Sequence, residues 1–186
     1  MIIRPAVMED AWPSARLLYD ALHDIAHQLT GQESKEDAIR GMAEFFREKE
    51  IRLGFPQALV CEIDGKVAGV VVAYAGNEAE RLDRPIVERL REMKHDSSIT
   101  LDKEADEDEF YIDTLSVSPE YGGQGIGSAL MKAAEERAKQ RGFQKIALAV
   151  VTGNDRAYRL YLRRGYEVDK EIIINHHVYY HMVKAL

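Results

Sequence analysis

Apolar and polar residues alternate along the chain with two different periods, which predict strands and amphipathic helices. Apolar residues at helical spacing predict one helix that begins near Ala11 and ends at Gly31. Further on, Ala58–Ile63 and Val67–Tyr74 have strand composition and flank Asp64-Gly65, a dipeptide that favours a type I′ turn. We therefore expect a β-hairpin after the N-terminal helices.

The second half of the chain alternates between strands and helices. The predicted strands and helices, in chain order, are Phe110–Val117, a helix from Ile126 to about Arg141, Lys145–Val151, a helix over Asp155–Arg164, Tyr166–Ile174 and Val178–Val183. No internal repeat or linker interrupts this order. The pattern predicts a single α/β domain over residues 1–186, with a mixed, mostly antiparallel sheet flanked by helices.

Residues 77–109 form a polar insertion that the strand and helix pattern does not explain. A weak helical pattern covers Arg84–Lys94, and an acidic run, Asp102–Glu109, follows it. The run holds six acidic residues and one lysine. It is either a solvated loop or a rim that attracts a cationic substrate by long-range electrostatics.

Composition excludes several classes of protein. The chain has 186 residues, of which 46% are hydrophobic and 31% charged, as is usual for a globular domain. A net charge of −7 argues against nucleic-acid binding. We find no apolar run long enough for a membrane span, no secretory signal and only one cysteine, Cys61, so we expect a cytoplasmic protein that binds neither membrane nor metal.

A glycine-rich loop between a strand and a helix is the strongest local signal for ligand binding. It contains Gly122, Gly123, Gly125 and Gly127, and free N–H groups at the start of the following helix favour phosphate binding. A dinucleotide-binding fingerprint needs a third glycine where Ser128 or Leu130 stands. A P-loop needs lysine in place of Ser128. The interpretation of the chain as a nucleotide-binding protein of another kind stays open.

Two motifs give the loop a more specific interpretation. Leu115-Ser116-Val117-Ser118-Pro119 followed by Gly125-Ile126-Gly127 resembles the acetyl-CoA-binding core of the GNAT N-acetyltransferase superfamily. A second family pattern is matched downstream by Asn154, Ala157, Tyr161, Gly165 and Tyr166. The family usually has Arg or Gln where this chain has Gly122. The backbone N–H of Gly122 can still donate a hydrogen bond to a phosphate. The resemblance covers most of the chain except residues 77–109.

The resemblance implies a set of residues that bind acetyl-CoA as co-substrate. The backbone of Leu115, Ser116 and Val117 would hold the pantetheine arm, and the Val117 amide would polarise the thioester carbonyl. Asn154 and Tyr161 would contact the arm of the cofactor. The pyrophosphate would lie on the amides of Gly122, Gly123, Gln124, Gly125, Ile126, Gly127 and Ser128.

The resemblance also implies catalytic candidates. Tyr161 would protonate the departing thiolate. Asp113 and Tyr111 share one face of their strand and are candidates for the general base, while Asp113 is equally well explained as a hydrogen-bonded structural acid. Some relatives place the base in the next strand, where this chain has Ala149. The histidines His176, His177 and His181 either line the acceptor site, bind a metal or, as we expect, form a solvated hairpin turn.

These residues imply an N-acetyltransferase that transfers the acetyl group of acetyl-CoA to a primary amine by direct attack in a ternary complex. The acceptor is a small-molecule or protein amine, and the acidic run suggests that it is cationic. The resemblance also allows a homodimer. The alternative is a non-catalytic acetyl-CoA-binding sensor of the same fold, which the Gly122 departure and the lack of a strong base favour.

Overall fold

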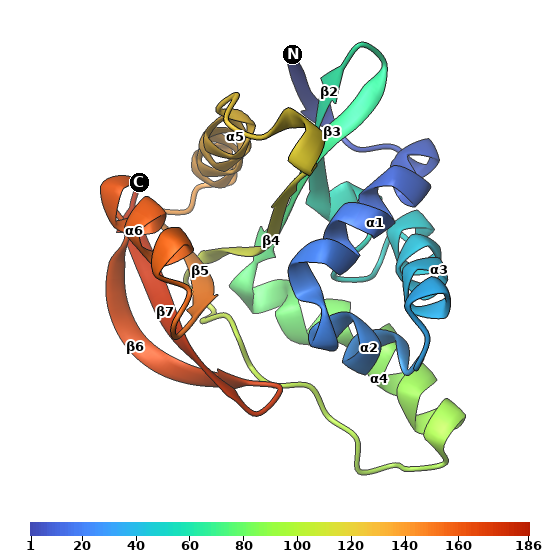
Figure 1. The fold of residues 1–186 in the computed structure, drawn as a ribbon. Helices are drawn as coiled ribbons and strands as arrows, with labels where there is room; N and C mark the ends of the chain where they lie inside the picture. Colours follow the sequence, from blue (N-terminus) through green and yellow to red (C-terminus); the bar gives the residue numbers. More distant parts are fainter.

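The computed structural model describes residues 1–186 and contains one seven-stranded sheet (Figure 1). The strands are β1 (Ile2–Pro5), β2 (Ala58–Ile63), β3 (Lys66–Ala75), β4 (Phe110–Val117), β5 (Lys145–Val151), β6 (Glu167–Ile174) and β7 (His177–Ala185). Their order in the sheet is β1-β2-β3-β4-β5-β7-β6. Every neighbouring pair is antiparallel except β4 and β5, which confirms the prediction of a mixed, mostly antiparallel sheet.

Helices cover both faces of the sheet. They are α1 (Ala11–Leu22), α2 (Asp24–Thr30), α3 (Lys35–Arg47), α4 (Ala79–Lys94), α5 (Ile126–Gln140) and α6 (Asp155–Arg163), with short 3-10 turns at Met8–Asp10, Phe55–Gln57, Gly76–Glu78 and Pro119–Tyr121. The first four helices pack on one face of the sheet and α5 and α6 on the other. No helix of the chain combines the length and the apolar character needed to cross a membrane.

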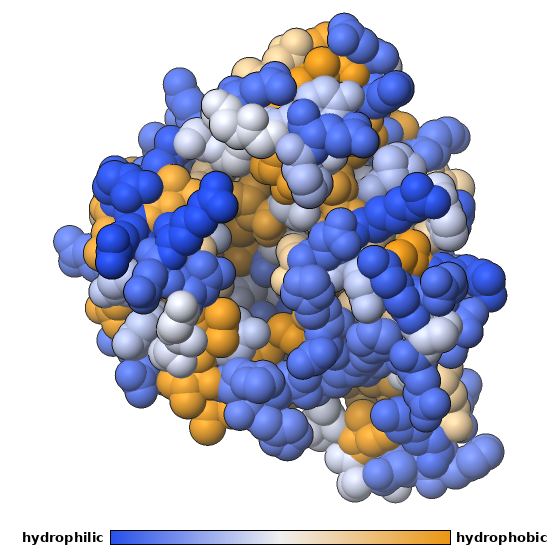
Figure 2. Space-filling view, viewed as in Figure 1, coloured by the Kyte–Doolittle hydropathy of each residue, from blue (hydrophilic) through white to orange (hydrophobic).

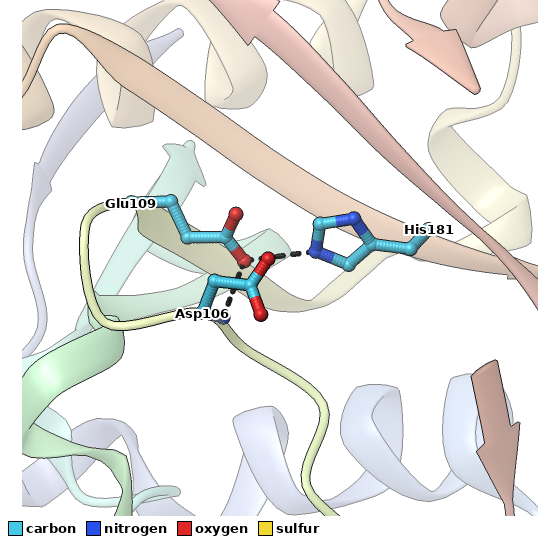
Figure 3. A group of neighbouring side chains, drawn as sticks. All are labelled: Asp106, Glu109 and His181. Atoms are coloured by element: carbon cyan, nitrogen blue, oxygen red, sulfur yellow. Dashed lines mark hydrogen bonds and ion pairs between the residues drawn. The ribbon is translucent and has the colours of Figure 1, made fainter. Parts of the chain in front are cut away.

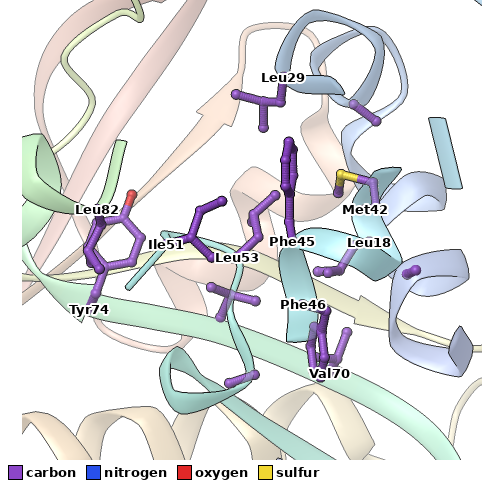
Figure 4. Close-up of a cluster of buried hydrophobic side chains, with 14 of the residues drawn as sticks. Leu18, Leu29, Met42, Phe45, Phe46, Ile51, Leu53, Val70, Tyr74 and Leu82 are labelled. Carbon is purple, nitrogen blue, oxygen red and sulfur yellow. The ribbon is translucent and has the colours of Figure 1, made fainter. Parts of the chain in front are cut away.

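The core beneath α1–α4 is built from aromatic and branched side chains (Figure 4). Phe46, Leu18 and Met42 are fully buried there, and Val70 of β3 forms part of its floor. Each such side chain contributes roughly 1.5–3 kcal/mol by leaving water. This core fixes the position of α1 and α2 against the middle of the sheet.

The N-terminal helix is interrupted, contrary to the continuous helix that the sequence predicts. His23 adopts φ 43° and ψ −109° and separates α1 from α2. Positive φ is uncommon for a non-glycine residue. No glycine or proline marks the break, so the hydrophobic period alone does not reveal it. The predicted hairpin turn is confirmed, with φ 51° at Asp64 and 75° at Gly65.

A β-bulge in β4 changes which side chains face each core. Val72 pairs with Thr114 and Ala73 with Ile112, so Asp113 is the extra residue on β4. Ile112 faces the α5 core, and after the bulge Leu115 packs against that same core. The bulge therefore shifts the alternation of side chains by one residue in the middle of the sheet.

Strands β4 and β5 separate at this bulge. Their parallel pairing runs only from Phe110↔Ile146 to Ile112↔Leu148, although β4 continues to Val117 and β5 to Val151. Over its second half β5 pairs only with β7. One edge of β4 is left without a partner strand, and this opening positions the site described below.

Candidate functional site

The free edge of β4 presents backbone groups to the opening. The N–H of Ser118 donates to the carbonyl of Ala68, at the end of the pairing with β3. Successive residues of a strand direct their backbone groups to opposite edges. Val117 and Leu115 therefore turn their N–H and C=O groups toward the side where β5 has diverged, as is needed to bind an extended polar ligand.

The glycine-rich loop adds a run of unused N–H donors at the same end of β4. From Gly123 to Ser128 no N–H donates to another group of the protein, because the first helical bond of α5 runs from Ala129 to Gly125. Gly123 and Gly125 both have φ of 77°, a region that favours glycine. The loop and the positive end of the helix dipole together suit an anion.

Gly122 differs from the other glycines of the loop. Its N–H donates to the carbonyl of Pro119 at 3.1 Å, and its φ is −58°. The amide is therefore already engaged within the protein. The free donors begin at Gly123, one residue later than the sequence predicts.

A cavity of about 560 Å³ lies beside the opening. Figure 2 shows this face of the molecule hollowed between the C-terminal elements and the α1–α2 pair. The cavity brings together five of the residues that the sequence predicts for the site, namely Tyr111, Asp113, Leu115, Asn154 and Tyr161.

Tyr161 lies on α6 with its ring packed against the α5 core. The ring approaches Tyr166 with centroids 6.1 Å apart. Burial raises the pKa of the Tyr161 hydroxyl above its ordinary value. The hydroxyl therefore keeps its proton at neutral pH and is available as a donor.

Asn154 has a structural task in addition to lining the cavity. It is the N-cap of α6, and its side-chain oxygen accepts a hydrogen bond from the N–H of Ala157 at 3.2 Å. The side-chain amide NH₂ donates to no protein group. Asn154 thus fixes the start of α6, which in turn orients Tyr161 two turns later.

The floor of the cavity contains an ionic cluster that sequence reasoning did not identify. Arg52, which is 2% exposed, forms ion pairs with Asp113 and, at 2.7 Å, with Glu104. Its guanidinium also lies 3.3 Å from the carboxylate of Asp83 on α4. One buried cation therefore faces three carboxylates that come from three separate parts of the chain.

Asp113 is enclosed within this cluster. Its Oδ2 accepts hydrogen bonds from the Arg52 guanidinium and from the hydroxyl of Tyr74 at 2.8 Å, and its Oδ1 accepts from Thr114 at 2.8 Å. Its side chain is 1% exposed. These contacts favour the structural role of Asp113 over that of a general base.

Glu104 and Tyr111 form a second pair at the cavity wall. The hydroxyl of Tyr111 donates to Glu104 Oε2 at 2.9 Å, while Glu104 Oε1 accepts from Arg52. Burial raises the pKa of Glu104 against the opposing attraction of Arg52, and it raises the pKa of Tyr111 far above the ordinary tyrosine value. Tyr111 therefore acts as a hydrogen-bond donor.

The acidic run is not the solvated loop that one interpretation of the sequence expects. Glu109 is completely buried, and Glu104 belongs to the ionic cluster of the cavity. Asp106 pairs with Lys170 at 2.6 Å, and Asp108 with Lys145 at 2.9 Å. Most of its charge is thus neutralised within the protein, which also weakens the interpretation of the run as a steering rim.

Asp106, Glu109 and His181 form a cluster with metal-ligand chemistry (Figure 3). Their ligand atoms lie within 4.8 Å of one another. Glu109 Oε1 accepts from the ring Nε2 of His181 and from the N–H of Asp106, both at 2.9 Å, and Lys170 occupies the Asp106 carboxylate. Glu109 Oε2 and His181 Nδ1 are buried without a hydrogen-bond partner, but each lies near an ionic group, Lys145 at 3.8 Å and Asp169 at 3.4 Å respectively. The cluster fastens the acidic run to β7.

The three histidines of the C-terminal hairpin do not act together. His176 and His177 are exposed at the turn, as expected, and His177 also lines the cavity beside β4. His181 is instead fully buried on β7, so its assignment to a solvated turn was wrong. The alternation of β7 places it on the sheet face opposite Met182, which a hydrophobicity pattern alone does not indicate.

The opened β4 edge, the free donors at α5 and the adjacent cavity are consistent with comparisons to known proteins. Residues 15–166 match the family model of the acetyltransferase (GNAT) family. The chain belongs to the GNAT family. Members of this family are acetyltransferases that use acetyl-CoA as the acetyl donor.

Solved GNAT structures match this chain along its whole length. A crystal structure described as an acetyltransferase has 33% identity and a TM-score of 0.82, covering 100% of this chain and 99% of its own. An N-acetyltransferase from Staphylococcus aureus Mu50 has 27% identity and a TM-score of 0.84, covering 98% and 100%.

Curated GNAT relatives match over shorter regions. A thialysine N-epsilon-acetyltransferase of Bos taurus is 44% identical over 55 residues, which are 30% of this chain and 32% of the relative. An uncharacterized N-acetyltransferase of Methanocaldococcus jannaschii is 31% identical over 114 residues, or 61% and 40%. The matched part of this chain thus spans well under half the length of either relative.

Proposed function

We propose that this GNAT chain transfers the acetyl group of acetyl-CoA to a primary amine in a ternary complex. The observation that carries the proposal is the unbroken run of free N–H donors from Gly123 to Ser128, next to the open edge of β4. These donors fit a pyrophosphate, and the edge of β4 at Leu115 and Val117 fits the amide-containing pantetheine arm. Both features are made by backbone atoms.

The residues around the cavity have defined tasks in this proposal. When bound, acetyl-CoA supplies a thioester whose acetyl group passes to the nitrogen of the acceptor. The Val117 amide stabilises the negative charge that develops on the thioester oxygen. Tyr161 donates its proton to the sulfur as the thiolate departs, and its raised pKa keeps that proton in place until then.

The charge of the cavity supports a cationic acceptor. Four carboxylates line it, from Asp20, Asp24, Glu104 and Asp113, against the single guanidinium of Arg52. Asp20 and Asp24 are exposed and belong to no ion pair, so they are free to attract an ammonium group. The partial similarity to an enzyme named for the N-epsilon of thialysine is consistent with an amine at the end of a flexible side chain.

Calorimetric titration with acetyl-CoA, with ATP as the control ligand, tests the binding part of the proposal. We expect acetyl-CoA to bind with micromolar affinity and ATP to bind much more weakly, because ATP lacks the arm that pairs with β4. Failure of acetyl-CoA to bind contradicts the proposal. Binding of ATP without binding of acetyl-CoA instead supports another kind of nucleotide-binding protein.

A further inference from the structure

The ionic cluster on the cavity floor has a shortage of positive charge. Arg52 faces the carboxylates of Asp83, Glu104 and Asp113, which leaves two negative charges uncompensated if all three are ionised. Buried carboxylates of this kind either take up a proton or attract a further cation. An ammonium group that enters the cavity can meet either need, because it is a cation and also carries protons that it can donate.

The three carboxylates differ in how much of their hydrogen-bonding capacity is already occupied by protein groups. Asp113 accepts four hydrogen bonds and is almost completely enclosed. Asp83 lines only a different cavity, on the α4 side of Arg52, which Glu104 also lines. Glu104 accepts only one hydrogen bond at each oxygen and lines the cavity that contains Tyr161. A carboxylate with two acceptor sites per oxygen therefore has capacity left for a ligand.

We infer that Glu104 is the general base that removes the proton from the acceptor ammonium. This inference rests on the proposed acetyl transfer. Glu104 takes one proton from R–NH₃⁺ to give R–NH₂ and a carboxylic acid. The nitrogen lone pair then forms the C–N bond as the C–S bond breaks, and the thiolate receives the Tyr161 proton. The second proton lost by nitrogen returns through solvent to the Tyr161 phenolate, and Glu104 releases its proton to solvent, so that one proton is released per acetyl group transferred.

Several charged and titratable groups adjoin Glu104 and set its behaviour. They are Arg52, Tyr111 and Asp113, with Tyr74 and Asp83 in the same cluster and Tyr179 of β7 nearby. Burial raises the pKa of Glu104, so its carboxylate is a stronger base than that of an exposed glutamate. Tyr111 acts as a positioning residue that holds the carboxylate at the cavity wall.

The sequence gives no hint of this role, because Glu104 lies in the acidic run and outside the motifs of the family. The run brings it to the site by two anchors on either side. Asp102 accepts a hydrogen bond from the N–H of Asn175 at 2.8 Å, and Asp106 pairs with Lys170. Both anchors belong to the β6–β7 hairpin region, so the run is held across the end of the sheet.

The test compares the Glu104→Gln variant with Glu107→Gln. Glu107 belongs to the same run but is exposed, and it does not line the cavity that holds Tyr161. We expect Glu104→Gln to lower kcat/KM about 100-fold at pH 7 with a lysine-like amine, whereas acetyl-CoA affinity stays within a factor of three. Glu107→Gln should leave kcat/KM within a factor of two.

The basicity of the acceptor separates a base from a structural residue. A lysine-like amine has a pKa of about 10.4 and an α-amine about 7.7, so the α-amine is partly neutral before it binds. The defect of Glu104→Gln should shrink at least fivefold with the α-amine. An equal defect with both amines, or no defect, overturns the assignment.

The pH profile gives an independent readout on the wild-type enzyme. The active form needs Glu104 as carboxylate, so kcat/KM should fall as the pH drops through the raised pKa of Glu104. Glu104→Asp should keep this acid limb with a lower rate, and Glu104→Gln should lose it. An acid limb that persists in Glu104→Gln overturns the assignment, whereas absence of any transfer by the wild type refutes the proposed function instead.

Discussion

The two halves of the candidate site are built in different ways. The acetyl-CoA half uses backbone groups of one continuous segment, from β4 through the glycine loop to α5. The acceptor half uses side chains from segments far apart, such as Arg52 with Glu104 and Asp113. Backbone donors depend on local geometry, while the ionic cluster depends on the whole fold.

The two halves are therefore sensitive to different substitutions. A backbone site tolerates most side-chain changes and fails only when the conformation of the loop fails, as at a glycine with positive φ. A buried cluster fails when a single partner is removed, because the remaining charges stay buried. Substitutions in the acceptor half should therefore affect stability and turnover, and those in the loop should affect affinity.

The largest effect is expected for Arg52→Met. Removing the guanidinium leaves Asp113 and Glu104 buried without a cation, which should lower the free energy of unfolding by about 3–5 kcal/mol. The loss should decrease as the pH falls, because protonation of the carboxylates removes the unpaired charge. Urea denaturation at several pH values measures both.

The control for Arg52 is Arg81→Met, which removes an exposed guanidinium on α4 that pairs with Glu78. Exposed pairs contribute about 1 kcal/mol or less. If Arg52→Met and Arg81→Met have equal free energies of unfolding, the ionic cluster does not stabilise the acceptor half of the site.

Tyr161→Phe is expected to have the next largest effect. Without the hydroxyl proton the thiolate leaves unprotonated, so turnover should fall at least tenfold while acetyl-CoA affinity changes little. Steady-state kinetics and calorimetry measure the two quantities. Tyr158→Phe, on the preceding turn of α6, keeps its packing against Tyr180 and is the matched control. Unchanged turnover in Tyr161→Phe refutes the role of Tyr161.

Gly125→Ala should mainly weaken acetyl-CoA binding. Its φ of 77° is unfavourable for alanine by about 1–2 kcal/mol, so relief of this strain should displace the free amides and lower affinity about tenfold. Gly142→Ala is matched for strain, since Gly142 has φ of 83° and, as at Gly125, an added Cβ would meet no atom within 4 Å. Both should lose similar stability, but only Gly125→Ala should lose affinity. Equal affinities would contradict the loop assignment.

Asp24→Asn should have the smallest effect. The exposed carboxylate at the cavity mouth attracts a cationic acceptor through solvent, so its loss should raise KM about twofold to threefold at low salt. The difference should vanish at high salt. Asp64→Asn is the control, because Asn-Gly keeps the hairpin turn. A salt-independent change in KM argues against attraction through solvent.

The sequence predicted the backbone half well for a physical reason. Glycines, a strand end and a helix start are local features, so the glycine loop and the bounds of β4 and β5 lie where the sequence predicts them. The engagement of the Gly122 amide by Pro119 was not predictable, because it depends on the 3-10 turn before the loop.

The acceptor half was predicted poorly for the opposite reason. Arg52 and Glu104 are 52 residues apart, and no periodicity connects them. The acidic run resembled a solvated loop because burial of Glu109 depends on His181, far along the chain. The break of the N-terminal helix at His23 likewise had no local signal.

An acetyl-transfer assay with acetyl-CoA and a lysine-like primary amine tests the proposed activity most directly. CoA release is followed by thiol detection, and the N-acetylated amine is identified by mass spectrometry. We expect the two products to form in equal amounts and both to fall together in Tyr161→Phe. Binding of acetyl-CoA without any acetylated product across a panel of amines would contradict the proposed activity and would identify the chain as a non-catalytic acetyl-CoA-binding sensor.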